Sequence, residues 1–137
     1  MEVRRDIRDD RLVLTPDGAL LVAGPAEEFE SLLQTVLAEG HRHLIVNLEH
    51  VAHLDSGGIR AVVRGYLTAQ RLGGSLTLCN ADRHVHRLIS LMRLDTVFPM
   101  FECLDAALAA PHTVAATMVN PSAQQAPSAR QEADRWP

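Results

Sequence analysis

The sequence has few aromatic residues, few cysteines and little net charge, and each shortage excludes a class of protein. Aromatic residues make up 4% of the 137 residues, so we expect a core of aliphatic side chains. The two cysteines, Cys79 and Cys103, show no CxxC spacing, which argues against a disulfide framework or a zinc site. A formal net charge of -4 does not indicate a nucleic acid or an anionic membrane as a partner.

Long apolar runs are also missing. None approaches the roughly 20 residues that a membrane span needs. The opening stretch MEVRRDIRDD is charged and lacks the apolar segment of a secretory signal. These features predict a cytoplasmic protein without a membrane span.

The composition divides the chain into a folded part and a tail. With 47% hydrophobic residues, the chain has enough apolar surface for one globular domain, predicted over residues 1–110. Residues 111–137 are rich in Pro, Ala, Ser and Gln and show no packable periodicity, so we predict a disordered C-terminal tail. Trp136 is interpreted as part of an untethered terminus rather than as a docking residue.

Strand and helix patterns alternate along the predicted domain. Short strands are expected at residues 4–10, 11–16, 19–24, 43–48, 75–79 and 96–101, with a turn at Pro16-Asp17-Gly18. Helices are expected around 29–37, 57–72, 85–92 and 103–110; their inward residues are Phe29, Leu32, Leu33, Val36, Leu37, Ile59, Val62, Val63, Tyr66, Val85, Leu88, Ile89 and Met92. This alternation predicts a single α/β domain with a mixed, mostly parallel β-sheet packed by about four α-helices.

The stretch HLDSGGIRAVV, residues 53–63, contains the sequence that surrounds the nucleophilic serine of trypsin-like proteases. A trypsin-like enzyme needs a histidine and then an aspartate upstream, but no aspartate lies between the histidines at 41–53 and Asp55. An amphipathic helix also follows Ser56, where the protease has a strand. Leu54 replaces the first glycine of the G-x-S-x-G elbow of α/β-hydrolases. A serine hydrolase with some other arrangement is therefore only the weaker alternative.

Ser56 has the properties of a helix start. It precedes a helical pattern, so we predict that it is the N-cap, with Gly57 and Gly58 leaving the first turn open to a close approach. Arg60 and Arg64 follow at i and i+4 on the same helix. They form either a solvated basic face or a surface that orients a carboxylate or phosphate of a partner.

Two histidine pairs, His41-x-His43 and His84-x-His86, have no obvious third ligand. Solvated surface histidines are the favoured interpretation, and no metal site is predicted.

Five features occur in a specific order along residues 12–110. An apolar strand ends in Asn-Leu (HLIVNL), a short link leads to LDS, and GGI opens a helix. Gly-Gly then precedes the strand SLTLC, and LDTVF follows late in the chain. In this order the chain resembles the STAS domain family, and in particular the anti-sigma factor antagonists. It departs from the usual family pattern at Gly57, where a second Ser or Thr is common, and at Ile59, where Leu is common.

The resemblance implies a non-enzymatic switch. In the family, the serine directly after the aspartate is phosphorylated by a partner kinase that is also an anti-sigma factor, and here that serine is Ser56. The implied partner is a GHKL-type serine/threonine-protein kinase, which supplies ATP and Mg²⁺, so the chain needs no cofactor of its own. Unmodified, the chain would bind the kinase, release a sigma factor and so regulate transcription. The expected partner-binding residues are Asp55, Ser56, Gly57, Gly58, Arg60 and Arg64.

Two further points stay open on the sequence alone. The same fold could serve as a scaffold subunit of another signalling assembly. The chain could also form a homodimer, and no direct contact with nucleic acid is expected.

Overall fold

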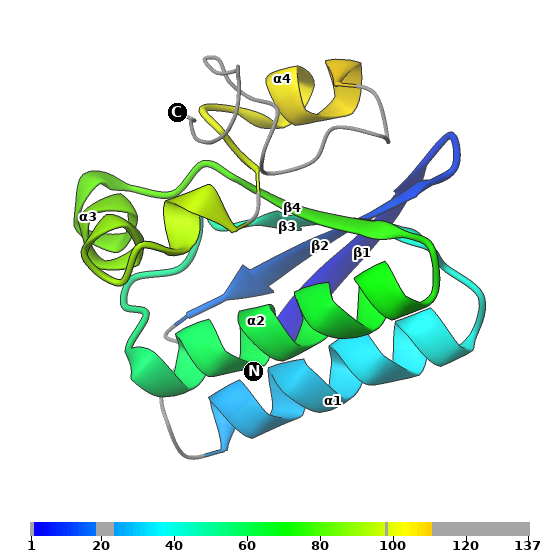
Figure 1. Ribbon diagram of the computed structural model, residues 1–137, viewed down its shortest axis with the longest axis horizontal. Helices are drawn as coiled ribbons and strands as arrows, with labels where there is room; N and C mark the ends of the chain where they lie inside the picture. Colours follow the sequence, from blue (N-terminus) through cyan, green and yellow to red (C-terminus); the bar gives the residue numbers. More distant parts are fainter. Residues whose placement is uncertain (1, 19–23, 98, 111–137) are drawn as a thin grey trace.

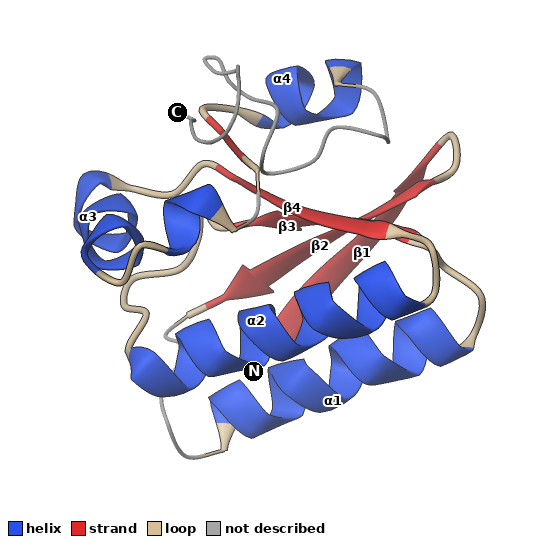
Figure 2. Ribbon diagram, viewed as in Figure 1, coloured by secondary structure: helices blue, strands red, loops and turns tan. Residues whose placement is uncertain are grey.

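The computed structural model describes residues 2–18, 24–97 and 99–110 of the chain. Strands and helices alternate along most of it, as Figure 2 shows. In chain order the elements are β1 (Glu2–Arg8), β2 (Arg11–Asp17), α1 (Pro25–Ala38), β3 (His43–Asn47), α2 (Ser56–Arg71), β4 (Ser75–Cys79), α3 (Arg83–Leu91), the 3-10 helix η1 (Leu94–Thr96), β5 (Met100–Phe101) and α4 (Leu104–Ala109).

The strands form one five-stranded sheet in the order β1-β2-β3-β4-β5. β1 and β2 are an antiparallel hairpin, and β2–β3, β3–β4 and β4–β5 are parallel pairs. Each parallel pair is joined by a crossover that contains a helix, as parallel pairing requires. The predicted α/β class with a mixed, mostly parallel sheet and four α-helices is confirmed.

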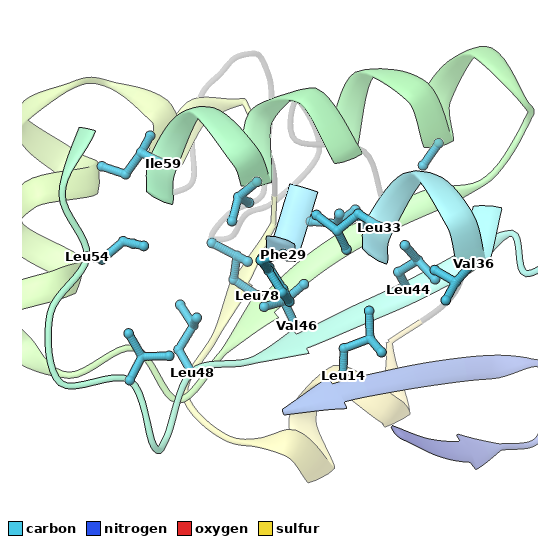
Figure 3. Packing of buried hydrophobic residues seen from close by; sticks show 14 of the residues in the cluster. Leu14, Phe29, Leu33, Val36, Leu44, Val46, Leu48, Leu54, Ile59 and Leu78 are labelled. Carbon is cyan, nitrogen blue, oxygen red and sulfur yellow. The ribbon is translucent and has the colours of Figure 1, made fainter. Parts of the chain in front are cut away.

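Helices α1 and α2 lie side by side on one face of the sheet, and α4 lies on the other (Figure 1). Because side chains alternate across a strand, Leu12 and Leu14 of β2 join the large core beneath α1 and α2, whereas Val13 joins a smaller cluster beneath α4. Figure 3 shows the large core, with Phe29 and Leu33 of α1 pointing at strand residues such as Val46. Five predicted inward positions of α1 and α2 (Phe29, Leu33, Val36, Leu37 and Val62) are at most 1% exposed.

The two long helices approach each other closely at Gly65. A Cβ atom at this position would lie 2.7 Å from Cδ1 of Leu33 on α1, closer than side chains tolerate. The absence of a side chain at Gly65 therefore sets how near α2 can pack against α1.

Arg11 holds α4 against the opposite face. Its guanidinium donates to the carbonyl oxygen of Ala107 at 2.9 Å, and also to the carbonyls of Leu108 and Ala110. The last carbonyls of a helix have no partner within the helix, so a cation placed there stabilises its C-terminus. A residue from β2 thus fixes a helix almost a hundred positions later in the chain.

Four local predictions are wrong. The strand expected at 4–10 is Glu2–Arg8 instead, because Asp9 and Asp10 form the turn that leads into β2. Pro16 and Asp17 do not form a turn but continue β2, since the pairing with β3 ends at Leu14 and the proline needs no ladder bond on that side. The strand expected at 96–101 is limited to Met100 and Phe101, because Thr96 belongs to η1. Met92 caps the end of α3 and is 45% exposed rather than buried.

Two further predictions concern residues that the structure does not describe. The strand expected at 19–24 and the tail at 111–137 lie almost wholly outside the described residues. They stay predictions.

Candidate functional site

The loop that enters α2 starts at the carboxyl end of β3, the edge where open α/β sheets usually bind their ligands. A buried side chain, Asn47, anchors it with only 3% of its surface exposed. Its Oδ1 accepts hydrogen bonds from the backbone N–H of Glu49 at 3.2 Å and from Nδ2 of Asn80 at 3.0 Å. Its Nδ2 donates to Oε1 of Glu49 at 2.9 Å. Asn47 therefore ties the ends of β3 and β4 to the loop that leads to Ser56.

The N-cap of α2 is Asp55, not Ser56 as the sequence suggested. Asp55 has an extended backbone (φ -99°, ψ -171°), and its Oδ1 accepts from the backbone N–H groups of Gly57 at 3.0 Å and Gly58 at 3.1 Å. Its carbonyl also accepts from the N–H of Ile59 at 3.0 Å. The carboxylate thus satisfies two amides that would otherwise have no partner at the start of the helix.

This leaves Ser56 as the first helical residue, with an exposed side chain. Among the described residues, no hydrogen bond engages its hydroxyl group. Gly57 and Gly58 behind it are buried, so they carry the backbone of the first turn into the core while Ser56 faces outward. The prediction of a serine at the start of this helix is confirmed. The prediction that this serine is the N-cap is wrong.

The exposed side chains of α2 continue in one line from Ser56 through Arg60 and Arg64 to Leu67. Nη1 of Arg64 lies 3.1 Å from Oε2 of Glu30 on α1, an ion pair in which the carboxylate side chain is 27% exposed. Arg64 is therefore already engaged within the chain. No ion pair of Arg60 is found in the described part of the structure.

A groove of about 280 Å³ runs between the N-terminal halves of α1 and α2. It is lined by Arg60, Arg64 and Gly57 of α2 and by Ala26, Glu27, Glu30 and Ser31 of α1. The α1 residues were missed at the sequence level. Their only signal was the acidic first turn of that helix, which does not reveal that α1 lies beside α2.

A hydrolase would need a general base close to Ser56 within the part of the chain that is described. A serine nucleophile needs a base within hydrogen-bonding reach, and no hydrogen bond between Ser56 and a histidine is found there. His43 instead pairs its Nδ1 with Oγ of Ser75 at 3.0 Å, and His84 and His86 are exposed on α3. Within residues 2–18, 24–97 and 99–110, no group of three or more His, Cys, Asp or Glu side chains could hold a metal ion.

The ionisable groups with raised pKa values belong to the core rather than to this site. Burial raises the pKa of Cys79 to about 12, with smaller contributions from Cys103 and Glu49. Burial also raises the pKa of Tyr66, which packs against the large core. Both groups stay protonated at neutral pH and are structural.

Among the described residues, no helix is both long enough and apolar enough to cross a bilayer.

A mixed sheet of this strand order, with two helices on one face and an exposed serine at the start of α2, defines a small α/β domain of the STAS type. The chain belongs to the STAS domain family, whose sequence model matches residues 1–107. This confirms the family resemblance seen in the motifs.

Individual proteins of known sequence or structure agree with this assignment. The chain is 26% identical over 110 residues to BtrV of Bordetella bronchiseptica, named as a candidate anti-sigma factor antagonist; the match covers 80% of this chain and 94% of BtrV. A candidate anti-sigma factor antagonist from Thermotoga maritima superposes with a TM-score of 0.73 at 23% identity, over 77% of this chain and 91% of that one. The Bacillus cell fate determinant SpoIIAA, solved in its phosphorylated form, gives 0.63 at 17% identity, over 78% and 96%. At these identities the two structures establish the fold alone.

Proposed function

We propose that this chain is an anti-sigma factor antagonist, and that phosphorylation of Ser56 controls its binding to an anti-sigma factor serine kinase. The observation that carries the proposal is the division of roles at the start of α2. Asp55 caps the helix through its Oδ1, so the exposed Ser56 hydroxyl is not needed for the fold and is available to a kinase.

The likeness to BtrV supports the same role, because the match covers nearly all of that protein. SpoIIAA, a protein of the same fold, has been solved in a phosphorylated form. The kinase, of the GHKL type, brings ATP and Mg²⁺, and this chain contributes the acceptor hydroxyl and a docking surface. Binding of the unmodified chain then releases the sigma factor for transcription.

The local electrostatics determine what a phosphate does at this position. A phosphate on Ser56 adds about -1.5 to -2 charge at neutral pH. The amides of Gly57 and Gly58 already bind the Asp55 carboxylate, so they do not receive the phosphate. Arg60, which is exposed one turn along the same helix, forms the charge-assisted hydrogen bond. The modified chain keeps its fold, while the net charge of its docking surface changes from positive to negative.

The proposed docking surface consists of Asp55, Ser56, Arg60 and Arg64, with Gly57 lining the groove beside them. Gly58, which the sequence also suggested as a contact, is buried and supports the first turn from behind. A phosphate at the centre of this docking surface must be desolvated on binding or must face partner carboxylates. A loss of about 2.7 kcal/mol weakens the complex roughly a hundredfold, which is enough for a switch.

Titration calorimetry with a candidate GHKL-type kinase tests this proposal. Ser56→Ala should bind as tightly as the unmodified chain and should gain no phosphate on incubation with kinase and ATP, as measured by intact mass. Ser56→Asp should fold normally and bind roughly a hundredfold more weakly. Gln70→Glu, which adds one negative charge at an exposed position near the other end of α2, is the matched control and should bind normally.

Two results would remove Ser56 from the mechanism. One is equal affinity of the Ser56→Asp chain and the unmodified chain for the kinase. The other is phosphate transfer to the Ser56→Ala chain at the normal rate.

A further inference from the structure

Strand β1 forms one edge of the sheet, and within the described residues nothing pairs with its outer side. An open edge strand is a template for pairing with another chain, and proteins usually protect such edges. This one spans seven residues, and Ile7, an apolar side chain within it, is 65% exposed. β1 therefore presents an exposed isoleucine among charged side chains of both signs, on an edge that no described strand covers.

The hairpin determines which backbone groups of β1 face outward. Only Asp9 and Asp10 separate Arg8 from its partner Arg11, and Asp9 has a positive φ of 58°, as tight two-residue hairpin loops require. The hydrogen bond of such a turn joins Arg8 to Arg11. Backbone groups in an antiparallel pair alternate, so those of Val3, Arg5 and Ile7 are directed to the open edge.

The sequence of β1, Glu-Val-Arg-Arg-Asp-Ile-Arg, is complementary to itself when reversed. A second β1 strand placed antiparallel, with a two-fold axis at Arg5, uses the outward backbone groups of both strands. The opposed residues are then Glu2 with Arg8, Val3 with Ile7 and Arg4 with Asp6, each pair occurring twice. Every charged residue except Arg5 meets an opposite charge, and Ile7 meets an apolar side chain.

These pairs also separate by face. Val3 and Ile7 lie opposite Pro16 and Leu12 of β2, on the side of the sheet that α1 and α2 cover. The four charged pairs lie on the other side. Two of these charged side chains already contact each other within one strand, since Nε of Arg8 donates to Oδ2 of Asp6 at 2.7 Å.

The one like-charged pair, Arg5 with Arg5 of the second copy, is balanced from within each chain. Nη2 of Arg5 lies 3.4 Å from Oε1 of Glu39 at the end of α1. The charge of Arg5 in each copy is therefore partly neutralised by Glu39 of the same copy.

Neighbouring registers are disfavoured. Moving the axis to Arg4 places Arg4 opposite itself and Glu2 opposite Asp6. Moving it to Asp6 places Asp6 opposite itself and Arg4 opposite Arg8. Like charges directly opposite one another destabilise a strand pair. The register centred on Arg5 is therefore favoured over both alternatives.

We propose that two copies of this chain associate through antiparallel pairing of their β1 strands about Arg5, which joins the two sheets into one continuous sheet. The interface is formed by β1, with Glu39 at the end of α1 balancing the charge of Arg5. It is independent of Ser56 and of the kinase.

Analytical ultracentrifugation of the full chain, up to about 1 mM, tests the proposal. The unmodified chain should show a concentration-dependent dimer that weakens as salt is added. Arg4→Glu, which puts a carboxylate opposite Asp6 at both symmetric positions, should raise the dissociation constant by roughly tenfold or more. Asp6→Arg combined with Arg4→Glu re-creates the opposed pair with its signs exchanged, so this double variant should dimerise more tightly than Arg4→Glu.

Arg83→Glu is the matched control. It makes the same change in charge at an exposed position at the start of α3, and it should leave the dimer unchanged. Thermal unfolding followed by circular dichroism establishes that each variant is folded. The proposal is overturned if the unmodified chain is monomeric throughout, if Arg4→Glu dimerises as well as the unmodified chain, or if the double variant is no better than Arg4→Glu.

Discussion

The assignment of the helix cap to Asp55 makes a quantitative prediction that separates it from its neighbour Ser56. In the structure, one oxygen of Asp55 accepts two backbone N–H groups, at 3.0 and 3.1 Å, whereas the Ser56 side chain is exposed. Asp55→Ala should therefore lower the free energy of unfolding, and Ser56→Ala should leave it nearly unchanged.

The size of the effect follows from the groups involved. Removing an N-cap side chain costs about 0.5–2 kcal/mol. A carboxylate near the N-terminus of a helix adds about 0.3–1 kcal/mol through the macrodipole. Asp55 is partly buried, which reduces screening by solvent, so we expect Asp55→Ala to cost about 1–2 kcal/mol. Asp55→Asn keeps an oxygen acceptor and should lose only the smaller electrostatic part.

Urea unfolding of the three variants measures this directly. A change in stability at constant m-value appears as a shift in the midpoint. Ser56→Ala should stay within about 0.5 kcal/mol of the unmodified chain, the range typical of surface substitutions. If Ser56→Ala proved as costly as Asp55→Ala, the serine would contribute to the cap, and the argument that its hydroxyl is available to a kinase would fail.

Three other substitutions or treatments test the fold around the site. Leu33→Ala truncates a fully buried side chain and should cost about 2–5 kcal/mol in urea unfolding; a change below about 0.5 kcal/mol would contradict the burial of this face of α1. Asn47→Ala removes a buried side chain and leaves the partly buried amide of Asn80 without its acceptor, so it should cost about 1–3 kcal/mol. A neutral result would refute the role of Asn47 as an anchor. At pH 8 a thiol reagent should label only Cys103 in the folded chain, because burial and a pKa of about 12 keep Cys79 protonated and inaccessible; rapid double labelling before urea is added would contradict this.

The arrangement of strands and helices was largely predictable from local patterns. Apolar residues at helical spacing identified the buried face of α1, where Leu33 and Val36 are fully buried. Short apolar runs identified β3 and β4. These patterns are reliable because a side chain's direction repeats with the period of its own element.

Local patterns failed where a neighbouring element decided the outcome. Pro16 is a turn signal in most sequences, but here β3 ends before it and β2 continues. Met92 has the correct helical spacing, but α3 ends at Leu91, so its side chain is exposed. The position at which an element stops depends on its partners in space.

The sequence also could not decide whether Asp55 or Ser56 is the N-cap of α2. Both residue types are good caps, and they are adjacent. The backbone dihedrals decide: Asp55 is extended and stands outside the helix, while Ser56 is its first helical residue.

The sequence by itself determined that a serine follows an aspartate at the start of a helix in a parallel α/β sheet. The tertiary structure alone decided what surrounds that serine. Glu30 and Arg64 are 34 residues apart and meet because α1 and α2 pack side by side. Likewise, β1 becomes an open edge because β3 pairs with β2 on its other side. Such contacts depend on how separate elements pack together, and no pattern within a single element contains that information.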